Sequence, residues 1–329
     1  MKAIVCTKYG PPDVLQLKEV EKPAPKDNEV LIAVHAACIN QYDWHLLTAD
    51  VFMVRLMGGG LLKPKHTRPG ADMAGRVEAV GRNVQQLKPG DEVFGDLSAC
   101  GHGAFAEYVA APETAVALKP ANMTFEQAAA VPMAGVTALQ GLRDRGQIQP
   151  GQKVLINGAS GGVGTFAVQI AKAFGADVTA VCSTRNLDMA RSIGADHVID
   201  YTQEDFTKSG RLYDLILAAN GYHPLQAYKR ALAPKGIYVT TGGSLAQVMQ
   251  AMVLGSWMSE TSGKKVRGVT AAPSQKDLLF MKELMEAGKV VPVIDRCYPL
   301  SETAEALRYL GAGHARGKVV ITVRKNGKT

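Results

Sequence analysis

A glycine-rich run at residues 158–164 is the segment whose residue types and spacing best suit chemistry. It follows an apolar segment, 153–157, that we expect to be a strand, and a helical pattern begins near Val163. Gly161 lets the backbone approach a pyrophosphate, and Gly164 lets the helix pack on the strand. Free N–H groups and the helix dipole would hold the phosphates. The order strand, glycine loop, helix predicts a dinucleotide site rather than an ordinary tight turn.

The end of the next expected strand, 177–182, indicates which dinucleotide is bound. NAD sites commonly place Asp or Glu about 20 residues after the loop, to hold the ribose 2′-hydroxyl. No carboxylate stands at 181–186. The Ser183 hydroxyl and the Arg185 guanidinium suit a 2′-phosphate, through charge-assisted hydrogen bonds. We therefore expect NADP; the alternative is that Ser183 caps the next helix and Arg185 is solvated.

The elements that would position these groups change in style along the chain. Up to about residue 120, short strand-like runs alternate with Pro- and Gly-rich turns, which predicts a mostly-β domain. From Thr124, strand and helix patterns alternate, which is typical of βαβ units and a parallel sheet. The last strand pattern of the chain again resembles the short strand-like runs of the first 120 or so residues. We predict an α/β chain with one domain at 1–123, completed by 297–329, and a second at 124–296.

Composition and charge exclude several classes of protein. With 329 residues, 47% hydrophobic and 20% charged, the chain is neither disordered nor fibrous. No apolar run approaches the roughly 20 residues of a membrane span, and the opening segment is typical of a strand rather than a secretory signal. The net charge is 37 − 30 = +7, but the basic residues are scattered, so we expect no nucleic-acid partner. Five distant cysteines favour a reducing compartment, and we expect a cytoplasmic protein.

Several motifs together resemble one family. The chain is similar to the medium-chain dehydrogenase/reductase superfamily, in its zinc-free quinone oxidoreductase branch, near the reticulon-interacting and chloroplast-envelope homologues. The resemblance implies a GroES-like domain joined to a Rossmann domain. It is carried, besides the glycine loop, by Asn40-Gln41-Tyr42-Asp43, Pro69–Gly75, Lys88–Phe94, Gly103–Tyr108, Ile193–Tyr201 and His314–Lys318.

The resemblance also implies an activity. Zinc-dependent relatives carry a cysteine ligand where this chain has Asn40 and a histidine ligand where it has Ala71, so we expect no metal. Without a Lewis acid, the accessible reaction is hydride delivery from NADPH to a quinone or an α,β-unsaturated carbonyl compound. The alternative is a non-catalytic NADPH-binding regulatory protein of the same fold. The expected partner is a small-molecule substrate, and relatives are commonly homodimers.

Site residues are carried over from the family by position. Asn40 is the candidate catalytic residue, for contact with substrate or nicotinamide; its alternative is a cap on the following helical turn. His314, Ala315 and Arg316 would close over the cofactor, or form a solvated turn. The Met-rich segment 249–258 would line a substrate mouth, or be a buried helix or dimer contact. The remaining cofactor positions are Thr137, Ser160, Gly161, Gly162, Val163, Ser183, Arg185, Tyr201, Asn220, Gly242, Gly268 and Thr270.

Overall fold

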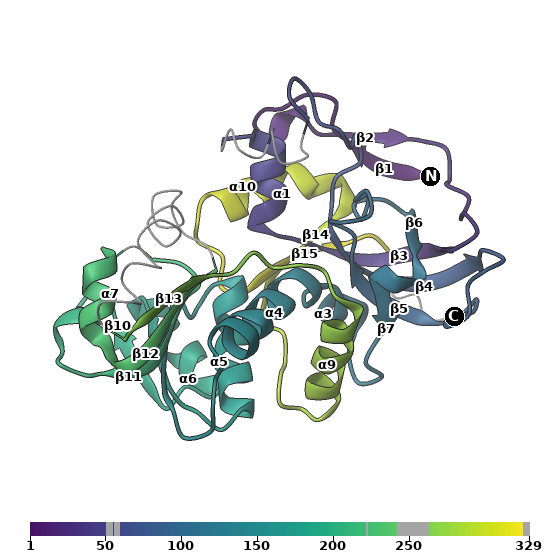
Figure 1. Ribbon diagram of the computed structural model, residues 1–329. Coiled ribbons are helices and arrows are strands. Elements are labelled where there is room, and N and C mark those ends of the chain that lie inside the picture. Colours follow the sequence, from purple (N-terminus) through teal and green to yellow (C-terminus); the bar gives the residue numbers. More distant parts are fainter. Residues whose placement is uncertain (51–54, 56–59, 222, 242–262, 325–329) are drawn as a thin grey trace. The chain divides into compact units, whose positions relative to one another are not determined.

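The computed structural model describes residues 1–50, 55, 60–221, 223–241 and 263–324 (Figure 1). The chain divides into two compact units, and each is described by itself. Unit 1 comprises residues 1–133, 273–286 and 294–329, and unit 2 comprises 134–272 and 287–293. No helix in these described ranges is long and apolar enough to cross a bilayer.

Unit 2 is built on a six-stranded parallel sheet with the order β10-β9-β8-β11-β12-β13. Its central strands are short apolar runs buried on both faces, as parallel sheets require. The chain moves outward from β8 to β10 and then returns to place β11 beside β8, so the order reverses there. The strands are β8 (Lys153–Asn157), β9 (Asp177–Cys182), β10 (His197–Asp200), β11 (Tyr213–Ala218), β12 (Leu232–Thr240) and β13 (Lys265–Gly268).

α-Helices connect β8 to β9, β9 to β10 and β11 to β12, as in βαβ units (Figure 1). The helix after the glycine loop packs on β8 and β9, and its inward residues are buried from Gly164 to Ala171. The next helix packs on β9 and β10. The helices are α4 (Pro132–Leu139, which starts in unit 1), α5 (Gly162–Ala173), α6 (Leu187–Ser192) and α7 (Leu225–Ala231).

Unit 1 holds a seven-stranded sheet with the order β14-β15-β3-β4-β5-β7, in which β6 also pairs with β3. Its core cluster includes Ile32, Met73 and Phe105. The two strands β1 (Lys2–Val5) and β2 (Gln16–Glu19) form a separate ribbon. The sheet strands are β3 (Glu29–Ile39), β4 (Asp72–Val80), β5 (Glu92–Asp96), β6 (Tyr108–Pro112), β7 (Val116–Leu118), β14 (Ile294–Pro299) and β15 (Lys318–Thr322).

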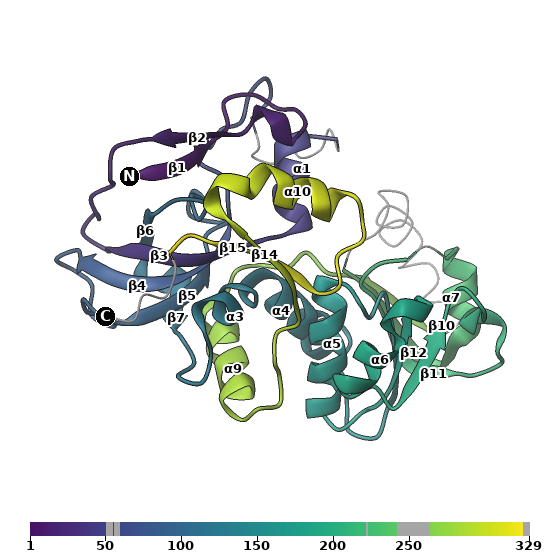
Figure 2. The same ribbon diagram turned by 180° about the vertical axis from the view of Figure 1, so that it is seen from behind.

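Within unit 1, helices α1, α3, α9 and α10 accompany the strands. The view from behind shows α10 (Thr303–Gly311) beside β14 and β15, on which it packs (Figure 2). α1 (Gln41–Thr48) packs on α10, and α3 (Phe125–Ala129) packs on β3 and β4. α9 (Gln275–Glu286) packs on β7, and Gln275 Nε2 donates to the carbonyl oxygens of Glu113 and Val116.

The predicted fold class is confirmed, because a mostly-strand unit and a parallel-sheet unit are both present. A capping box starts α3, since the Gln127 N–H donates to Thr124 Oγ1 at 3.2 Å and the Thr124 N–H donates to Gln127 Oε1 at 2.9 Å. The compact units differ from the expected domain limits in α3 and α9, which pack on unit 1. The domain limits themselves stay a prediction.

One buried amide holds the segment 287–293 to unit 2. Gln169 on α5 donates to the carbonyl oxygen of Val291 at 3.0 Å and accepts from the Val291 N–H at 2.8 Å. Its Nε2 also donates to the Thr165 carbonyl oxygen at 3.0 Å. The Gln169 side chain thus binds both backbone groups of Val291, as a neighbouring strand would. This segment follows residues 273–286 of unit 1 in the sequence.

Replacing this amide should loosen that segment. We expect Gln169→Leu, which keeps the volume, to lower the stability of unit 2 by about 1–3 kcal/mol because three hydrogen bonds are lost. Hydrogen exchange at the Val291 amide and the urea midpoint measure the effect. Gln203→Leu, at an exposed position in the same unit, is the control. Unchanged exchange at Val291 would contradict the assignment.

Candidate functional site

The glycine loop connects β8 to α5 and leaves its backbone open. Gly158 has φ +81°, and a Cβ there would lie 2.7 Å from the Asn220 nitrogen. A Cβ on Gly164 would lie 2.1 Å from the Gly158 oxygen, so the helix packs against its own loop. A Cβ on Gly161 would meet only the Gly158 oxygen, at 3.6 Å. Ser160, Gly161, Gly162 and Val163 therefore form an uncrowded helix N-terminus, which fits a pyrophosphate.

Asn220, Gly268 and Thr270 lie at or after the carboxyl ends of two strands of unit 2, β11 and β13. Asn220 comes after β11, and its backbone N–H donates to the Asn157 carbonyl oxygen at 3.3 Å. This places Asn220 beside the glycine loop, at the point where the strand order reverses and ligands bind in such sheets. Gly268 ends β13 and Thr270 follows it, both exposed, while Thr137 is buried on α4.

The end of β9 and the end of β10 lie together. The Tyr201 N–H donates to the Cys182 carbonyl oxygen at 3.1 Å, which brings Tyr201 next to Ser183. Tyr201 is 60% exposed, and Arg185 is exposed as well. Ser183 starts the single helical turn Thr184–Asn186, and its hydroxyl accepts from Asn186 Nδ2 at 3.1 Å rather than from a backbone N–H.

A carboxylate that sequence reasoning missed lies at this corner. Asp200 ends β10 and is in register with Cys182 of β9. Its carboxylate accepts from the Thr184 hydroxyl and from the N–H and hydroxyl of Thr202. These hydrogen bonds lower the pKa of Asp200, so it is ionised at neutral pH. The signal that could have found it is the strand-like run 197–200, because parallel pairing with β9 brings its last residue beside Cys182, next to Ser183.

Four adjacent strands of unit 1 place polar side chains in a row across the sheet. Asp72 on β4 pairs with Asp96 on β5 and with Cys38 on β3. The register of β15 with β3, continued by one residue, sets Lys318 opposite Asn40. Directly paired residues point to the same sheet face, as do residues two apart, so all these side chains share one face.

Asn40 is held on both sides within this row. Its Oδ1 accepts from Lys318 Nζ, and its Nδ2 donates to Asp72 Oδ2 at 2.9 Å. Asp72 also accepts from the Met133 N–H, at 3.1 and 3.2 Å. Asn40 is 7% exposed and Lys318 3% exposed. The Asn40 side chain therefore faces the sheet row, and as the alternative predicts, Asn40 is also the N-cap of α1, in a capping box with Asp43.

Burial dominates the electrostatics of these carboxyl groups. It raises the pKa of Asp43 to about 7 and the pKa of Asp72 well above its usual range, and nearby Lys318 opposes both shifts. The pKa of Asp96 is also raised by burial. Asp43 Oδ2 accepts from the Asn40 N–H at 2.8 Å and so caps the start of α1. Lys318 lowers the pKa of each of these three buried carboxyl groups, but burial raises it by more.

Tyr42 forms a pair with His102 on the same unit. Tyr42 Oη and His102 Nε2 are 3.0 Å apart, and their rings stack. Burial raises the pKa of Tyr42 to about 12 and lowers the pKa of His102 to about 4. The pair is therefore neutral at neutral pH, and its hydroxyl is a hydrogen-bonding group rather than a phenolate.

The remaining expected positions belong to unit 1 or lie outside the described residues. His314, Ala315 and Arg316 belong to unit 1 and precede β15, and the Arg316 N–H donates to Asp295 Oδ2 at 2.9 Å. Gly242 and the Met-rich segment 249–258 lie outside the described residues. The structure thus assigns Asn40 and 314–316 to unit 1 and every other described cofactor position to unit 2.

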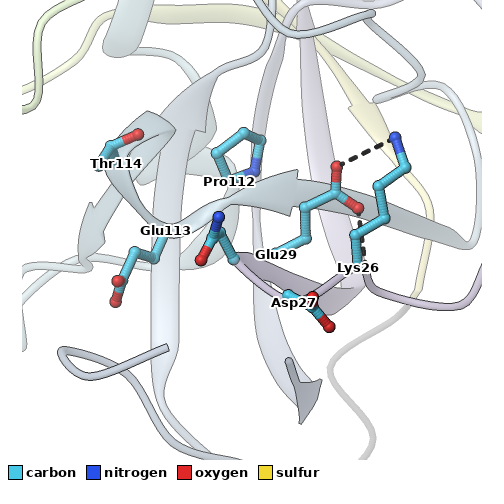
Figure 3. Close-up of a pocket in the computed structure, with 7 residues that line it drawn as sticks. Lys26, Asp27, Glu29, Pro112, Glu113 and Thr114 are labelled. Carbon is cyan, nitrogen blue, oxygen red and sulfur yellow. Dashed lines mark hydrogen bonds and ion pairs between the residues drawn. The ribbon is translucent and has the colours of Figure 1, made fainter. Parts of the chain in front are cut away.

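A surface pocket of unit 1 offers no competing site (Figure 3). Its charged groups already have partners: Glu29 lies 3.7 Å from Lys26 Nζ, and Asp27 accepts from Arg82 at 2.6 Å. Glu113 accepts from two backbone N–H groups at 3.0 and 3.2 Å. None of the positions expected from the sequence lines it. The lining residues are Lys26, Asp27, Asn28, Glu29, Pro112, Glu113 and Thr114.

Two family models match the chain. The model described as "Alcohol dehydrogenase GroES-like domain" matches residues 26–121, and that described as "Zinc-binding dehydrogenase" matches residues 193–321. The first match covers the strands β4, β5 and β6 of unit 1, and the second includes β10 to β15.

Relatives match along nearly the whole chain. A chloroplast envelope quinone oxidoreductase homolog of Arabidopsis thaliana is 34% identical over 93% of both chains. An NADPH-dependent alkenal/one oxidoreductase of the same plant, chloroplastic, is 36% identical over 98% of this chain and 79% of its own. Among solved structures, the quinone oxidoreductase from Coxiella burnetii is 31% identical, covers 98% of this chain and 99% of its own, and has a TM-score of 0.85.

The raised pKa of Asp43 predicts a pH dependence of stability. The folded chain holds this proton more tightly than the unfolded chain, whose carboxyl keeps its ordinary value near 3.8. Between about pH 4 and pH 7 the folded state therefore binds more protons, and stability falls as the pH rises. Asp43→Asn keeps an acceptor for the Asn40 N–H but removes this loss, which is at most about 1.4 kcal/mol per pH unit.

Thermal midpoints at pH 5 and pH 8 measure this difference. We expect Asp43→Asn to lose less stability between these values than the wild type. The control Asp188→Asn changes an exposed carboxyl on α6 and should run parallel to the wild type. A parallel curve for Asp43→Asn as well would show that this carboxyl does not carry the effect.

Proposed function

We propose that this chain, which belongs to the medium-chain dehydrogenase/reductase superfamily in its quinone oxidoreductase branch, is an NADPH-dependent reductase of quinones or α,β-unsaturated carbonyl compounds. The observation that carries the proposal is the open glycine loop at the point where the strand order of unit 2 reverses. Relatives whose names state quinone oxidoreductase and NADPH-dependent alkenal/one oxidoreductase activity support the acceptor class.

The choice of NADPH over NADH rests on the corner formed by β9 and β10. Ser183 and Arg185 offer a hydroxyl and a guanidinium for a 2′-phosphate, beside the exposed ring of Tyr201. Asp200 would repel a phosphate, but its carboxylate accepts three hydrogen bonds from Thr184 and Thr202. Those donors are neutral, so Asp200 keeps its charge, and the Arg185 guanidinium is the group that we expect to bind the phosphate.

When bound, the cofactor supplies the hydride, which goes to the β-carbon of an enone or to the quinone ring. The protein itself binds the pyrophosphate through the loop 160–163 and contacts the substrate or the nicotinamide through Asn40. It also excludes water from the reacting atoms. Protonation by water or a nearby donor completes the reduction. The cytoplasmic location and the homodimer stay predictions, which cell fractionation and light scattering would test.

The first experiment is NADPH oxidation, followed by absorbance, against a panel of alkenals, enones and quinones, with NADH in parallel. We expect turnover with NADPH strongly favoured. Equal use of NADH would contradict the 2′-phosphate assignment. Tight NADPH binding with no turnover on any acceptor would contradict the reductase and favour a non-catalytic NADPH-binding regulatory protein.

Arg185→Gln tests the cofactor preference directly. Removal of one charge-assisted contact to the 2′-phosphate should lower kcat/KM for NADPH by about 10- to 100-fold and leave that for NADH nearly unchanged. The matched control is Arg191→Gln, whose guanidinium pairs with Asp188 one helical turn away on α6. Equal losses with both cofactors would assign Arg185 a purely structural role.

A further inference from the structure

The match to a zinc-binding dehydrogenase model can be tested against the donor atoms of unit 1. Zinc-dependent relatives have cysteine at the position of Asn40 and histidine at that of Ala71. Alanine offers no donor atom, and zinc prefers thiolate, imidazole and carboxylate to an amide oxygen. The nearby Cys38 thiol donates to the Val319 carbonyl oxygen at 3.1 Å, and burial raises its pKa to about 12. These residues do not fit zinc.

Lys318 lies against Asn40, which is at the position of the cysteine ligand in zinc-dependent relatives. Lys318 Nζ donates to Asn40 Oδ1 and, at 3.4 Å, to the Ile39 carbonyl oxygen. The lysine is buried, and the carboxyl groups of Asp72 and Asp43 lie in the same cluster. An ammonium bound to this amide oxygen would repel a divalent cation at the same atom.

The hydrogen bonds also fix which way the Asn40 amide points. Lysine can only donate, so the amide oxygen faces Lys318, and the amide nitrogen is left to face Asp72, to which it donates. The amide nitrogen carries two hydrogens, and the hydrogen bond to Asp72 uses one of them. A positive charge on the oxygen polarises the amide and strengthens this N–H donor.

We propose that Lys318 acts through Asn40 to supply the positive charge that a metal ion supplies in zinc-dependent relatives, and thereby stabilises the oxyanion formed on the acceptor. The inference rests on the proposed reductase function. Lys318 is a positioning residue, and Asn40 is the residue that contacts the substrate.

Negative charge develops on the carbonyl oxygen of the acceptor during the hydride transfer. As hydride bonds to the β-carbon of an enone, the C=C electron pair forms a new bond to the carbonyl carbon. The C=O pair then moves to the oxygen, and the second N–H of Asn40 donates to this oxyanion. Water later protonates the α-carbon, and the carbonyl group forms again.

Two substitutions separate the charge of Lys318 from its shape. Lys318→Met removes the charge at similar length, and Lys318→Arg keeps it. Each variant would be assayed with a series of aryl enones that differ in electron-withdrawing substituents. We expect Lys318→Met to lower kcat about 10- to 100-fold, as loss of an oxyanion donor does, and Lys318→Arg to retain most of it.

The dependence on substituents is a readout that a structural role would not move. Without the charge, the acceptor must stabilise its own oxyanion, so the rate of Lys318→Met should depend more steeply on electron withdrawal. Asn40→Ala should steepen it likewise, and the double variant should be no slower than the slower single one. Asn40→Ala carries the test if circular dichroism shows that Lys318→Met does not fold.

Lys119→Met is the matched control. This lysine of unit 1 is buried, donates to the Met123 carbonyl oxygen at 2.6 Å and lies 3.1 Å from Glu92 Oε2. Its loss should leave the substituent dependence unchanged. An equal loss of rate with every acceptor in Lys318→Met, or stoichiometric zinc in the wild type by mass spectrometry, would overturn the inference. A wild type without turnover would instead overturn the proposed function.

Discussion

The antiparallel pairing of β15 with β3 is the constraint on which the polar row of unit 1 depends. It sets Val319 opposite Ile39 and thereby brings Lys318 against Asn40, from positions far apart in the sequence. β4 and β5 then add Asp72 and Asp96 in register. Burial of the Asp43, Asp72 and Asp96 carboxyl groups without a cation would cost free energy. The pairing of β15 with β3 lowers this cost because it brings Lys318 to them.

The candidate site of unit 2 differs from the row in unit 1, because it consists largely of backbone groups. The loops after parallel strands all emerge at one edge of the sheet, and the N–H groups of the helix that follows β8 point into it. The side chains there need only be small or exposed. A site of this kind depends on glycine at particular positions, whereas the row in unit 1 depends on which charged residue faces which.

This difference explains what the sequence could predict. The glycine loop is a local pattern, so Gly158 to Gly164 and the parallel sheet around it could be recognised without any knowledge of distant residues. The contact of Lys318 with Asn40 requires the register of two strands, which no local pattern specifies. For the same reason Asp200 was missed, since it reaches Ser183 only through the pairing of β10 with β9.

The route of the chain has a consequence for synthesis. The backbone passes from one unit to the other after residues 133, 272, 286 and 293, so neither unit is a continuous stretch. On a ribosome, the carboxyl groups of Asp72 and Asp96 emerge long before Lys318. The nascent first unit therefore carries acidic groups without their counter-charge, and its sheet gains that charge only after residue 318 has left the exit tunnel.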